Sequence, residues 1–254
     1  MGSAVTVQVE DGIATLLLQR EHGNAINADL VEELSAAVER AAADDRVRAA
    51  VLAAAGKLFC PGLDLQELVL FDRPAMERFV ERFGACSLAL YTFPKPLVAA
   101  IHGHAVAGGC VLALTADWRV LREGAVVGFN ETRVGVPFPF GVARILREAL
   151  PPSRLAEVAL LGRNYEGSAA IESGLVHEVA AAGEFESRWR ERAAELADKD
   201  GRAYALTKGY LRSEAVERIR AHDAGHRGEF LDAWFSPATR ARVASIAAEL
   251  RRGR

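Results

Sequence analysis

The first residues of the chain alternate between apolar and polar side chains. Between Ala4 and Gln19 the sequence reads AVTVQVEDGIATLLLQ, in which an alternating half precedes an apolar half. Asp11 and Gly12 separate the two halves, and this dipeptide favours the tight turn of a β-hairpin. The pattern therefore predicts that the fold begins with two antiparallel strands.

After the hairpin the apolar residues change to helical spacing, and helices then alternate with buried strands. Within Asp29–Ala42, apolar side chains such as Leu30, Leu34 and Val38 recur every three or four positions, which is typical of a helix with one buried face. Repeated rounds of strand, strand and helix predict an α/β fold wound as a spiral. The further elements predicted in this way are the strand Val47–Ala54, a helix over Pro74–Tyr91, the strand Pro96–Ala100, a helix after Gly108 and the strand Trp118–Leu121.

The last third of the chain has a different pattern. Strand signals fade after Val179, and residues 185–254 are rich in Ala, Arg and Glu, with Gly201 and Pro237 as expected helix breaks. We therefore divide the chain into a core of residues 1–184 and a helical region of residues 185–254. Apolar side chains of the helical region could pack on the same subunit or on a neighbour, and we favour a neighbour. Those side chains are Phe230, Trp234, Phe235 and Ile246.

Composition excludes several classes of function. The formal net charge is -3, and no long basic block is present, so nucleic acid is not an expected partner. The longest apolar runs, Leu97–Ile101 and Val111–Leu114, are too short to cross a membrane. Cysteine occurs three times, an odd number that does not suit a disulfide framework and indicates a reducing, cytoplasmic setting.

The segment HGHAVAGGCVLAL, residues 102–114, places adjacent glycines where a strand turns into a helix. Gly103 and Gly108 have phosphate-loop spacing, but Gly109 and Cys110 stand where such a loop needs Lys and Ser or Thr. A dinucleotide fingerprint is absent as well. Two interpretations stay open: the backbone N–H groups at the helix start could bind an oxyanion, or the glycines could allow close strand–helix packing. Spacing alone favours packing.

A second glycine turn, KLFCPGLDL at residues 57–65, also follows a buried strand and precedes a helical stretch. Together with HGHAVAGGCVLALTAD, VGFNETRVG and the first-loop sequence NAIN at residues 24–27, it resembles the enoyl-CoA hydratase/isomerase (crotonase) superfamily. The resemblance extends over nearly the whole chain. It implies a crotonase-like spiral of β-β-α units with a C-terminal helical region, and a site for an acyl-CoA thioester.

The resemblance also implies which residues form that site. In the family, two backbone N–H groups bind the thioester oxygen, and the matching residues here are Leu63 and Gly108. No metal or separate cofactor is expected, because coenzyme A enters as part of the thioester substrate. The family forms trimers and pairs of trimers, so a homotrimer or a dimer of trimers is expected. The residues expected to contact the ligand are Ala25, Ile26, Pro61, Gly62, Leu63, Asp64, Leu65 and Gly108.

The proton-transfer groups distinguish reactions within the family. Hydratases use two glutamates; Val111 occupies the position of the first, and Glu131 in GFNETRVGVP matches the second. A single carboxylate suffices to move a double bond from 3-enoyl-CoA to 2-enoyl-CoA through a dienolate, and the NET sequence also resembles 3,2-trans-enoyl-CoA isomerases. We therefore favour isomerisation over hydration, another crotonase-type reaction, or a non-catalytic acyl-CoA-binding subunit. Acyl-chain preference should depend on residues 68–91 and 137–141.

Three other features carry weaker hypotheses. His222 and His226 have the spacing of a zinc helix, but no third ligand is evident. Cys110 lies near a helix start, where a thiol can become a nucleophile. His102 and His104 are expected to be ordinary packing or hydrogen-bonding residues.

Overall fold

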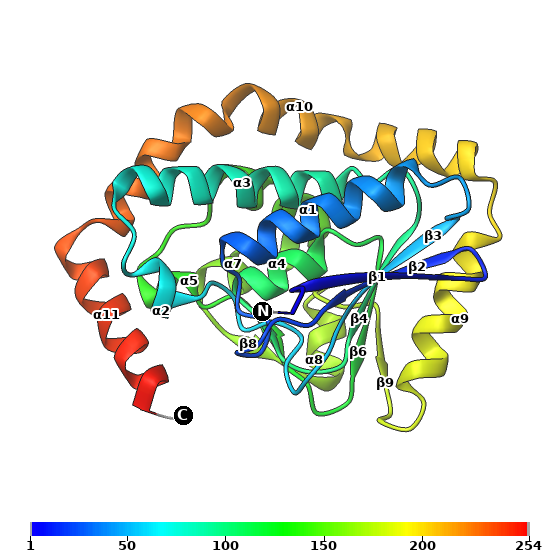
Figure 1. Ribbon diagram of the computed structural model, residues 1–254, viewed down its shortest axis with the longest axis horizontal. Helices are drawn as coiled ribbons and strands as arrows, with labels where there is room; N and C mark the ends of the chain where they lie inside the picture. Colours follow the sequence, from blue (N-terminus) through cyan, green and yellow to red (C-terminus); the bar gives the residue numbers. More distant parts are fainter. Residues whose placement is uncertain (1, 253–254) are drawn as a thin grey trace.

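A six-stranded sheet is the framework of the fold (Figure 1). The computed structural model describes residues 2–252. The strand order is β1-β2-β3-β4-β6-β9, in which β1 and β2 are antiparallel and every later neighbour is parallel. A second, three-stranded sheet has the order β5-β7-β8. The strands are β1 (Val5–Glu10), β2 (Ile13–Leu18), β3 (Ala49–Ala54), β4 (Leu97–Ile101), β5 (Ala105–Val106), β6 (Trp118–Arg122), β7 (Val127–Gly128), β8 (Asn164–Tyr165) and β9 (Glu178–Ala180).

Helices cover both faces of the large sheet. In Figure 1, α3 lies between α1 and α10 on one side of the molecule, and α11 lies at the end opposite α9. The helices are α1 (Ala28–Ala43), α2 (Leu65–Leu68), α3 (Arg73–Tyr91), α4 (Gly108–Leu114), α5 (Glu131–Val134), α6 (Phe140–Ala149), α7 (Pro152–Leu160), α8 (Gly167–Glu172), α9 (Phe185–Ala197), α10 (Gly201–Trp234) and α11 (Pro237–Arg252).

The predicted hairpin is confirmed. Asp11 has φ 51° and Gly12 has φ 81°, and positive φ at both central residues is what a two-residue hairpin turn of the favoured twist requires. A Cβ atom on Gly12 would lie 2.7 Å from Nε of Arg48, so the turn is also crowded by a neighbouring side chain.

The first predicted helix is confirmed with bounds one residue wider at each end. Asn27 caps it by accepting a hydrogen bond from the Leu30 backbone N–H at 3.0 Å. Leu30, Leu34 and Val38 are buried in the main core, as the helical spacing requires. The predicted strands and the helices over α3 and α4 agree with the structure to within two or three residues.

The short strands confirm the spiral. Each turn of the chain adds one strand to the large sheet and one short extended segment to a second layer. In that layer Ile26 forms a parallel bridge with Leu63, Cys60 forms one with Ala105, and β5 pairs in parallel with β7. The residues that follow these short segments, at the starts of α2, α4 and α5, are therefore brought close together.

The helical region after residue 184 packs on its own chain. Gly201 begins α10 and Pro237 begins α11, so both predicted breaks are confirmed. Phe230 and Trp234 are buried in the core of the same subunit, and therefore the preference for a neighbouring subunit was wrong for these two side chains. Helix α10, which carries both side chains, packs on α3 and α6 of the same chain. The division into residues 1–184 and 185–254 stays a prediction.

Helices α6, α7 and α8 were not predicted. They are short, and Pro151 and Pro152 interrupt the sequence pattern between α6 and α7 although Pro152 is the first residue of α7. Proline suits that position because its missing N–H has no helical acceptor there.

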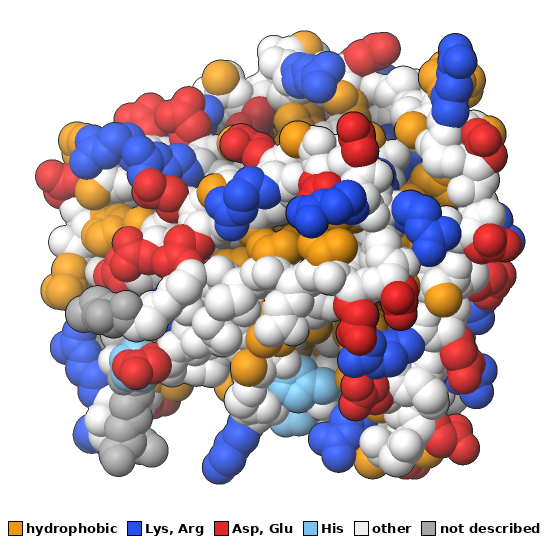
Figure 2. Space-filling view, turned by 45° about the vertical axis from the view of Figure 1, so that its right-hand side comes forward, with side chains coloured by type: hydrophobic (Ala, Val, Ile, Leu, Met, Phe, Trp, Pro, Cys, Tyr) orange, Lys and Arg blue, Asp and Glu red, His pale blue; other side chains and the backbone are white. Residues whose placement is uncertain are grey.

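The surface carries charges of both signs. Figure 2 shows Lys and Arg side chains interspersed with Asp and Glu side chains over one face, with hydrophobic side chains exposed in small groups between them. Within residues 2–252, no helix has the length and apolar character needed to cross a lipid bilayer.

Candidate active site

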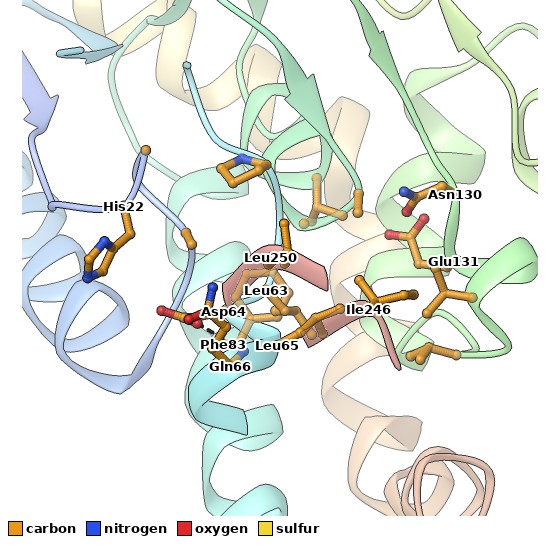
Figure 3. A pocket seen from close by; sticks show the side chains of 18 of the residues that line it. His22, Leu63, Asp64, Leu65, Gln66, Phe83, Asn130, Glu131, Ile246 and Leu250 are labelled. Atoms are coloured by element: carbon orange, nitrogen blue, oxygen red, sulfur yellow. Dashed lines mark hydrogen bonds between the residues drawn. The ribbon is translucent and has the colours of Figure 1, made fainter. Parts of the chain in front are cut away.

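One cavity of about 940 Å³ collects most of the residues singled out in the sequence (Figure 3). Its walls come from the loop before α1, from the turns before α2 and α4, from α5, and from α3, α6, α10 and α11. Site residues from five turns of the chain thus meet at one place. The predicted residues that line it are Ala25, Pro61, Leu63, Asp64, Leu65, Gly108, Val111 and Glu131.

Leu63 presents an unused backbone donor to this cavity. The backbone on either side of it is fixed, because Ile26 N–H donates to Gly62 at 2.8 Å and Asp64 N–H donates to Ile26 at 2.8 Å. In this parallel arrangement alternate N–H groups point away from the partner segment. Among residues 2–252 the Leu63 N–H has no hydrogen-bond acceptor.

Gly108 presents a second such donor. It is the first residue of α4, whose N-cap, Ala107, makes no side-chain cap. The Gly108 N–H likewise finds no acceptor in the described part of the chain, and it lies at the positive end of the helix dipole. Ala107 itself has φ 51° and ψ -127°, an unfavourable conformation for a residue with a side chain.

Close packing of the two glycine turns brings these donors together. Gly62 has φ 99°, and a Cβ atom there would lie 2.9 Å from the Ala107 Cβ and 3.3 Å from the Gly108 nitrogen. A Cβ atom on Gly109 would lie 2.1 Å from the carbonyl oxygen of Cys60. Each of the two interpretations therefore applies to one glycine of the pair. Gly109 is required for close packing, and Gly108 offers a free N–H that could bind an oxyanion.

Glu131 faces the same cavity as the first residue of α5, directly after β7 (Figure 3). Its Oε2 atom is buried and has no hydrogen-bond partner among the described residues. Burial raises the pKa of Glu131 from 4.5 to about 7, and hydrogen bonds from the backbone of Glu131 and Asn130 only partly oppose the shift. Arg133 does not counteract it, because its guanidinium donates to the Gly162 carbonyl. This carboxyl can therefore take up or release a proton near neutral pH.

Val111 supplies an apolar wall where a second acid would stand. It is 3% exposed and lies one helical turn after Gly108, and its N–H donates to the Ala107 carbonyl at 3.0 Å. Asp64, which also lines the cavity, is engaged elsewhere. It forms an ion pair with Arg20 at 2.8 Å and caps α2 by accepting from the Gln66 N–H at 3.2 Å.

Ile26 and Gly62 do not line the cavity, although both were expected to contact the ligand. Ile26 is fully buried, and a Cβ atom on Gly108 would lie 3.0 Å from its Cδ1. These two residues lie behind the donors, so their role here is to support the Leu63 and Gly108 backbones.

The sequence did not identify the individual residues of the apolar wall. Residues 68–91 and 137–141 do contribute to the cavity, through side chains on α3 and on the turn before α6, and Val142 of α6, outside the expected range, lines it as well. Helices α10 and α11 complete it, and no spacing rule links them to α3 because more than a hundred residues separate them. The wall residues include Phe79, Phe83, Phe138, Phe230, Trp234, Ile246 and Leu250.

The weaker hypotheses are not supported by the local geometry. Burial raises the pKa of the Cys110 thiol far above its ordinary value, which opposes a role as nucleophile. His226 stacks on Phe140 with centroids 4.5 Å apart and hydrogen-bonds to Glu229 at 3.2 Å. Among residues 2–252, no group of three or more His, Cys, Asp or Glu side chains could hold a metal ion.

The two remaining histidines are hydrogen-bonding residues. His102 Nε2 lies 2.9 Å from the Gly56 carbonyl oxygen, and His104 Nδ1 accepts a hydrogen bond from the Val126 N–H at 3.1 Å. These contacts agree with the ordinary role expected for both side chains.

Comparison with known proteins gives a consistent result. The family model described as enoyl-CoA hydratase/isomerase matches residues 8–234. A protein of Rhodobacter capsulatus named "Probable enoyl-CoA hydratase" is 32% identical over 205 residues, which cover 80% of this chain and 79% of that protein.

Solved structures agree with this match. The structure is similar to a Mycobacterium tuberculosis protein whose solved structures bear two names, an enoyl-CoA isomerase in one and a probable enoyl-CoA hydratase in the other. The match to the first has a TM-score of 0.84 and 30% identity, and it covers 91% of this chain and 100% of that one. The structure is also similar in fold to the human mitochondrial delta3-delta2-enoyl-CoA isomerase, with a TM-score of 0.94, 23% identity and coverage of 99% of both chains.

Proposed function

Because the chain belongs to the enoyl-CoA hydratase/isomerase family, we propose that it moves the double bond of a 3-enoyl-CoA thioester to the 2-position, with Glu131 as its only proton shuttle. One observation carries the proposal. Glu131 is a buried carboxyl with a pKa of about 7 in an apolar cavity, while Val111 replaces the acid that a second proton-transfer group would require.

The proposed reaction balances with one base. The Glu131 carboxylate removes a proton from the α-carbon, and the electron pair moves onto the thioester oxygen to give a dienolate. The Leu63 and Gly108 N–H groups donate to that oxygen, and the protonated Glu131 then returns the proton at the γ-carbon. Removal of one such oxyanion donor typically costs about 2.7–4 kcal/mol of barrier.

The apolar wall would help in two ways. It removes water from the reacting carbons, so that each hydrogen bond to the thioester oxygen is stronger than it would be in water. It also raises the pKa of Glu131, so that the carboxylate is a stronger base than an exposed glutamate, and a group with a pKa near the working pH is the most effective proton carrier.

Hydration or another crotonase-type reaction is the second candidate. It is favoured because sequence relatives, such as the one from Rhodobacter capsulatus, are named as probable hydratases. Adding water requires activation of the water and delivery of a proton to carbon, so a second polar group would have to act in place of Val111. A non-catalytic acyl-CoA-binding subunit would bind thioesters without turnover.

A direct assay separates these candidates. The purified protein is incubated with matched 3-enoyl-CoA and 2-enoyl-CoA thioesters of several chain lengths, and the products are identified by chromatography. We expect 3-enoyl to 2-enoyl conversion that falls about 100- to 10,000-fold in Glu131→Gln. The control Glu123→Gln, which alters an exposed carboxylate outside the cavity, should keep the wild-type rate.

Three outcomes would overturn the proposal. Equal isomerisation rates for wild type and Glu131→Gln would remove Glu131 from the reaction. Faster hydration of the 2-enoyl-CoA than isomerisation of the 3-enoyl-CoA would favour the second candidate. Tight binding of thioesters with no turnover of any would favour a binding subunit.

A further inference from the structure

We infer that Asn130 is a positioning residue for Glu131: its side-chain amide donates to one bound water, which donates in turn to the carboxylate and holds it toward the bound thioester. This inference rests on the proposed function, because it concerns the same proton transfer. It assigns a task to a side chain that the fold itself leaves unused.

Asn130 occupies a position where asparagine normally caps a helix. It is the N-cap of α5, and its side chain makes no cap hydrogen bond. Asn27, the N-cap of α1, behaves in the usual way: its Oδ1 accepts from the Leu30 N–H and its Nδ2 donates to Glu67 at 2.9 Å. Among residues 2–252 the Asn130 amide has no hydrogen-bond partner at all.

The unused amide is turned toward the cavity. Asn130 and Glu131 both line it, and Figure 3 shows their side chains next to each other on one side of the cavity. The other labelled polar side chains, which include His22, Asp64 and Gln66, lie on the opposite side. Asn130 is therefore the polar side chain placed to reach the Glu131 carboxylate.

Glu131 needs such a donor during the reaction. Its buried Oε2 has no partner although backbone hydrogen bonds act on the same carboxyl group, and an ionised carboxylate with one unpaired buried oxygen is disfavoured once the thioester displaces water. A neutral amide meets this need without holding the proton away from carbon. A guanidinium or ammonium group would instead favour the carboxylate so strongly that proton return would be hindered.

Few other groups act on Glu131 from the elements around it. The neighbouring thiol of Cys110 on α4 stays protonated because it is buried. Arg133 of α5 donates to Gly162, and Arg242 of α11 donates to the Val134 carbonyl at 3.1 Å. Glu249 of α11 also lines the cavity.

The test compares Asn130→Ala with wild type on 3-enoyl-CoA over the pH range 5 to 9. We expect kcat to fall by about 10- to 100-fold, as for a misplaced catalytic group, with KM changed by less than about threefold. Because the amide favours the charged carboxylate, its loss should move the acid limb of the rate profile to higher pH by about one unit. Asn130→Asp, which keeps the shape but replaces a donor with a like charge, should move that limb further in the same direction.

Two controls separate positioning from structural damage. Thr132→Ala alters the next residue but one on α5; its hydroxyl donates to Leu160 at 3.2 Å and does not line the cavity. This variant should leave the pH profile unchanged. Carboxyl-carbon NMR of labelled glutamate, assigned with Glu131→Gln, reports the Glu131 titration in the protein without substrate and should show the same upward shift in Asn130→Ala.

The outcomes distinguish this inference from the proposed function. An unchanged rate profile and an unchanged Glu131 titration in Asn130→Ala, with Glu131→Gln inactive, would overturn the inference and leave the proposed function standing. If alanine disturbs folding, Asn130→Leu, which has nearly the same shape but neither a donor nor a charge, decides by the same two measurements. Wild-type activity in Glu131→Gln would overturn the proposed function itself.

Discussion

Two largely buried carboxylates, Glu131 and Asp117, have opposite surroundings. Asp117 accepts hydrogen bonds from Lys208 at 2.7 Å, from Arg212 at 2.7 Å and from the Leu97 backbone N–H at 2.8 Å. Glu131 has an oxygen with no partner and faces a cavity. Burial of a carboxyl thus fastens the structure when cations enclose it, and it raises the pKa of the carboxyl when they do not, which is what the proposed function of Glu131 requires.

The enclosed carboxylate fastens α10 to the rest of the molecule. Lys208 also donates to the Lys95 carbonyl at 3.2 Å, and the Arg212 guanidinium lies 4.2 Å from the centre of the Tyr91 ring. The far end of the same helix carries Phe230 and Trp234 into the wall of the cavity. The ion pairs of Asp117 therefore help to hold the cavity around Glu131 in shape, although Asp117 itself takes no part in the proposed reaction.

The largest expected effect on stability comes from removing the charge of Asp117, which Lys208 and Arg212 enclose. Asp117→Asn leaves Lys208 and Arg212 buried without their counter-charge, and removal of one partner from such a network typically costs about 3–5 kcal/mol. Urea denaturation monitored by circular dichroism measures the free energy of unfolding. A loss below about 1 kcal/mol would show that these cations find other partners.

The pH dependence of the free energy of unfolding should reveal the raised pKa of Glu131. The folded pKa of Glu131, about 7, lies above its ordinary 4.5, so the stability linked to this group is complete below pH 4.5 and is lost as the pH rises through 7. Relative to Glu131→Gln, the wild type should lose up to about 3 kcal/mol of unfolding free energy over that range. Parallel urea titrations at several pH values measure this difference, and a constant difference would contradict the raised pKa.

Replacing Asp117, Lys208 and Arg212 together should lower the free energy of unfolding less than replacing Asp117 alone. In the triple variant Asp117→Leu, Lys208→Met, Arg212→Met no unpaired charge remains, and such apolar replacements are often neutral. We expect a loss of less than about 2 kcal/mol, smaller than that of Asp117→Asn alone. A triple variant less stable than the single one would indicate that the ion pairs stabilise the fold in their own right.

The smallest effect is expected at the thiol nearest Glu131. Cys110→Ala should change the isomerisation barrier by less than about 1 kcal/mol, which is under about sixfold in rate, because the buried thiol stays protonated and takes no part. Initial rates with saturating 3-enoyl-CoA measure this change. Loss of activity comparable to that of Glu131→Gln would instead support thiol chemistry.

Local pattern was enough for the elements that depend on neighbours in sequence. The hairpin followed from Asp11–Gly12, the first long helix from its apolar spacing, and the breaks at Gly201 and Pro237 from their backbone preferences. These are local properties because each depends on a few consecutive backbone conformations. The donors at Leu63 and Gly108 were implied only by the resemblance of the motifs at residues 57–65 and 102–114 to a known family, because spacing alone favoured packing.

What only the tertiary structure decided is which side chains meet. The sequence marked Glu131 and Val111, but it could not show that Phe230 and Trp234 close the cavity of their own subunit or that the Asn130 amide is left without a cap. It also could not show that Lys208 and Arg212 enclose Asp117 while one oxygen of Glu131 has no partner. Contacts between segments a hundred residues apart determine the solvation of each carboxyl, and solvation determines whether it holds a helix or carries a proton.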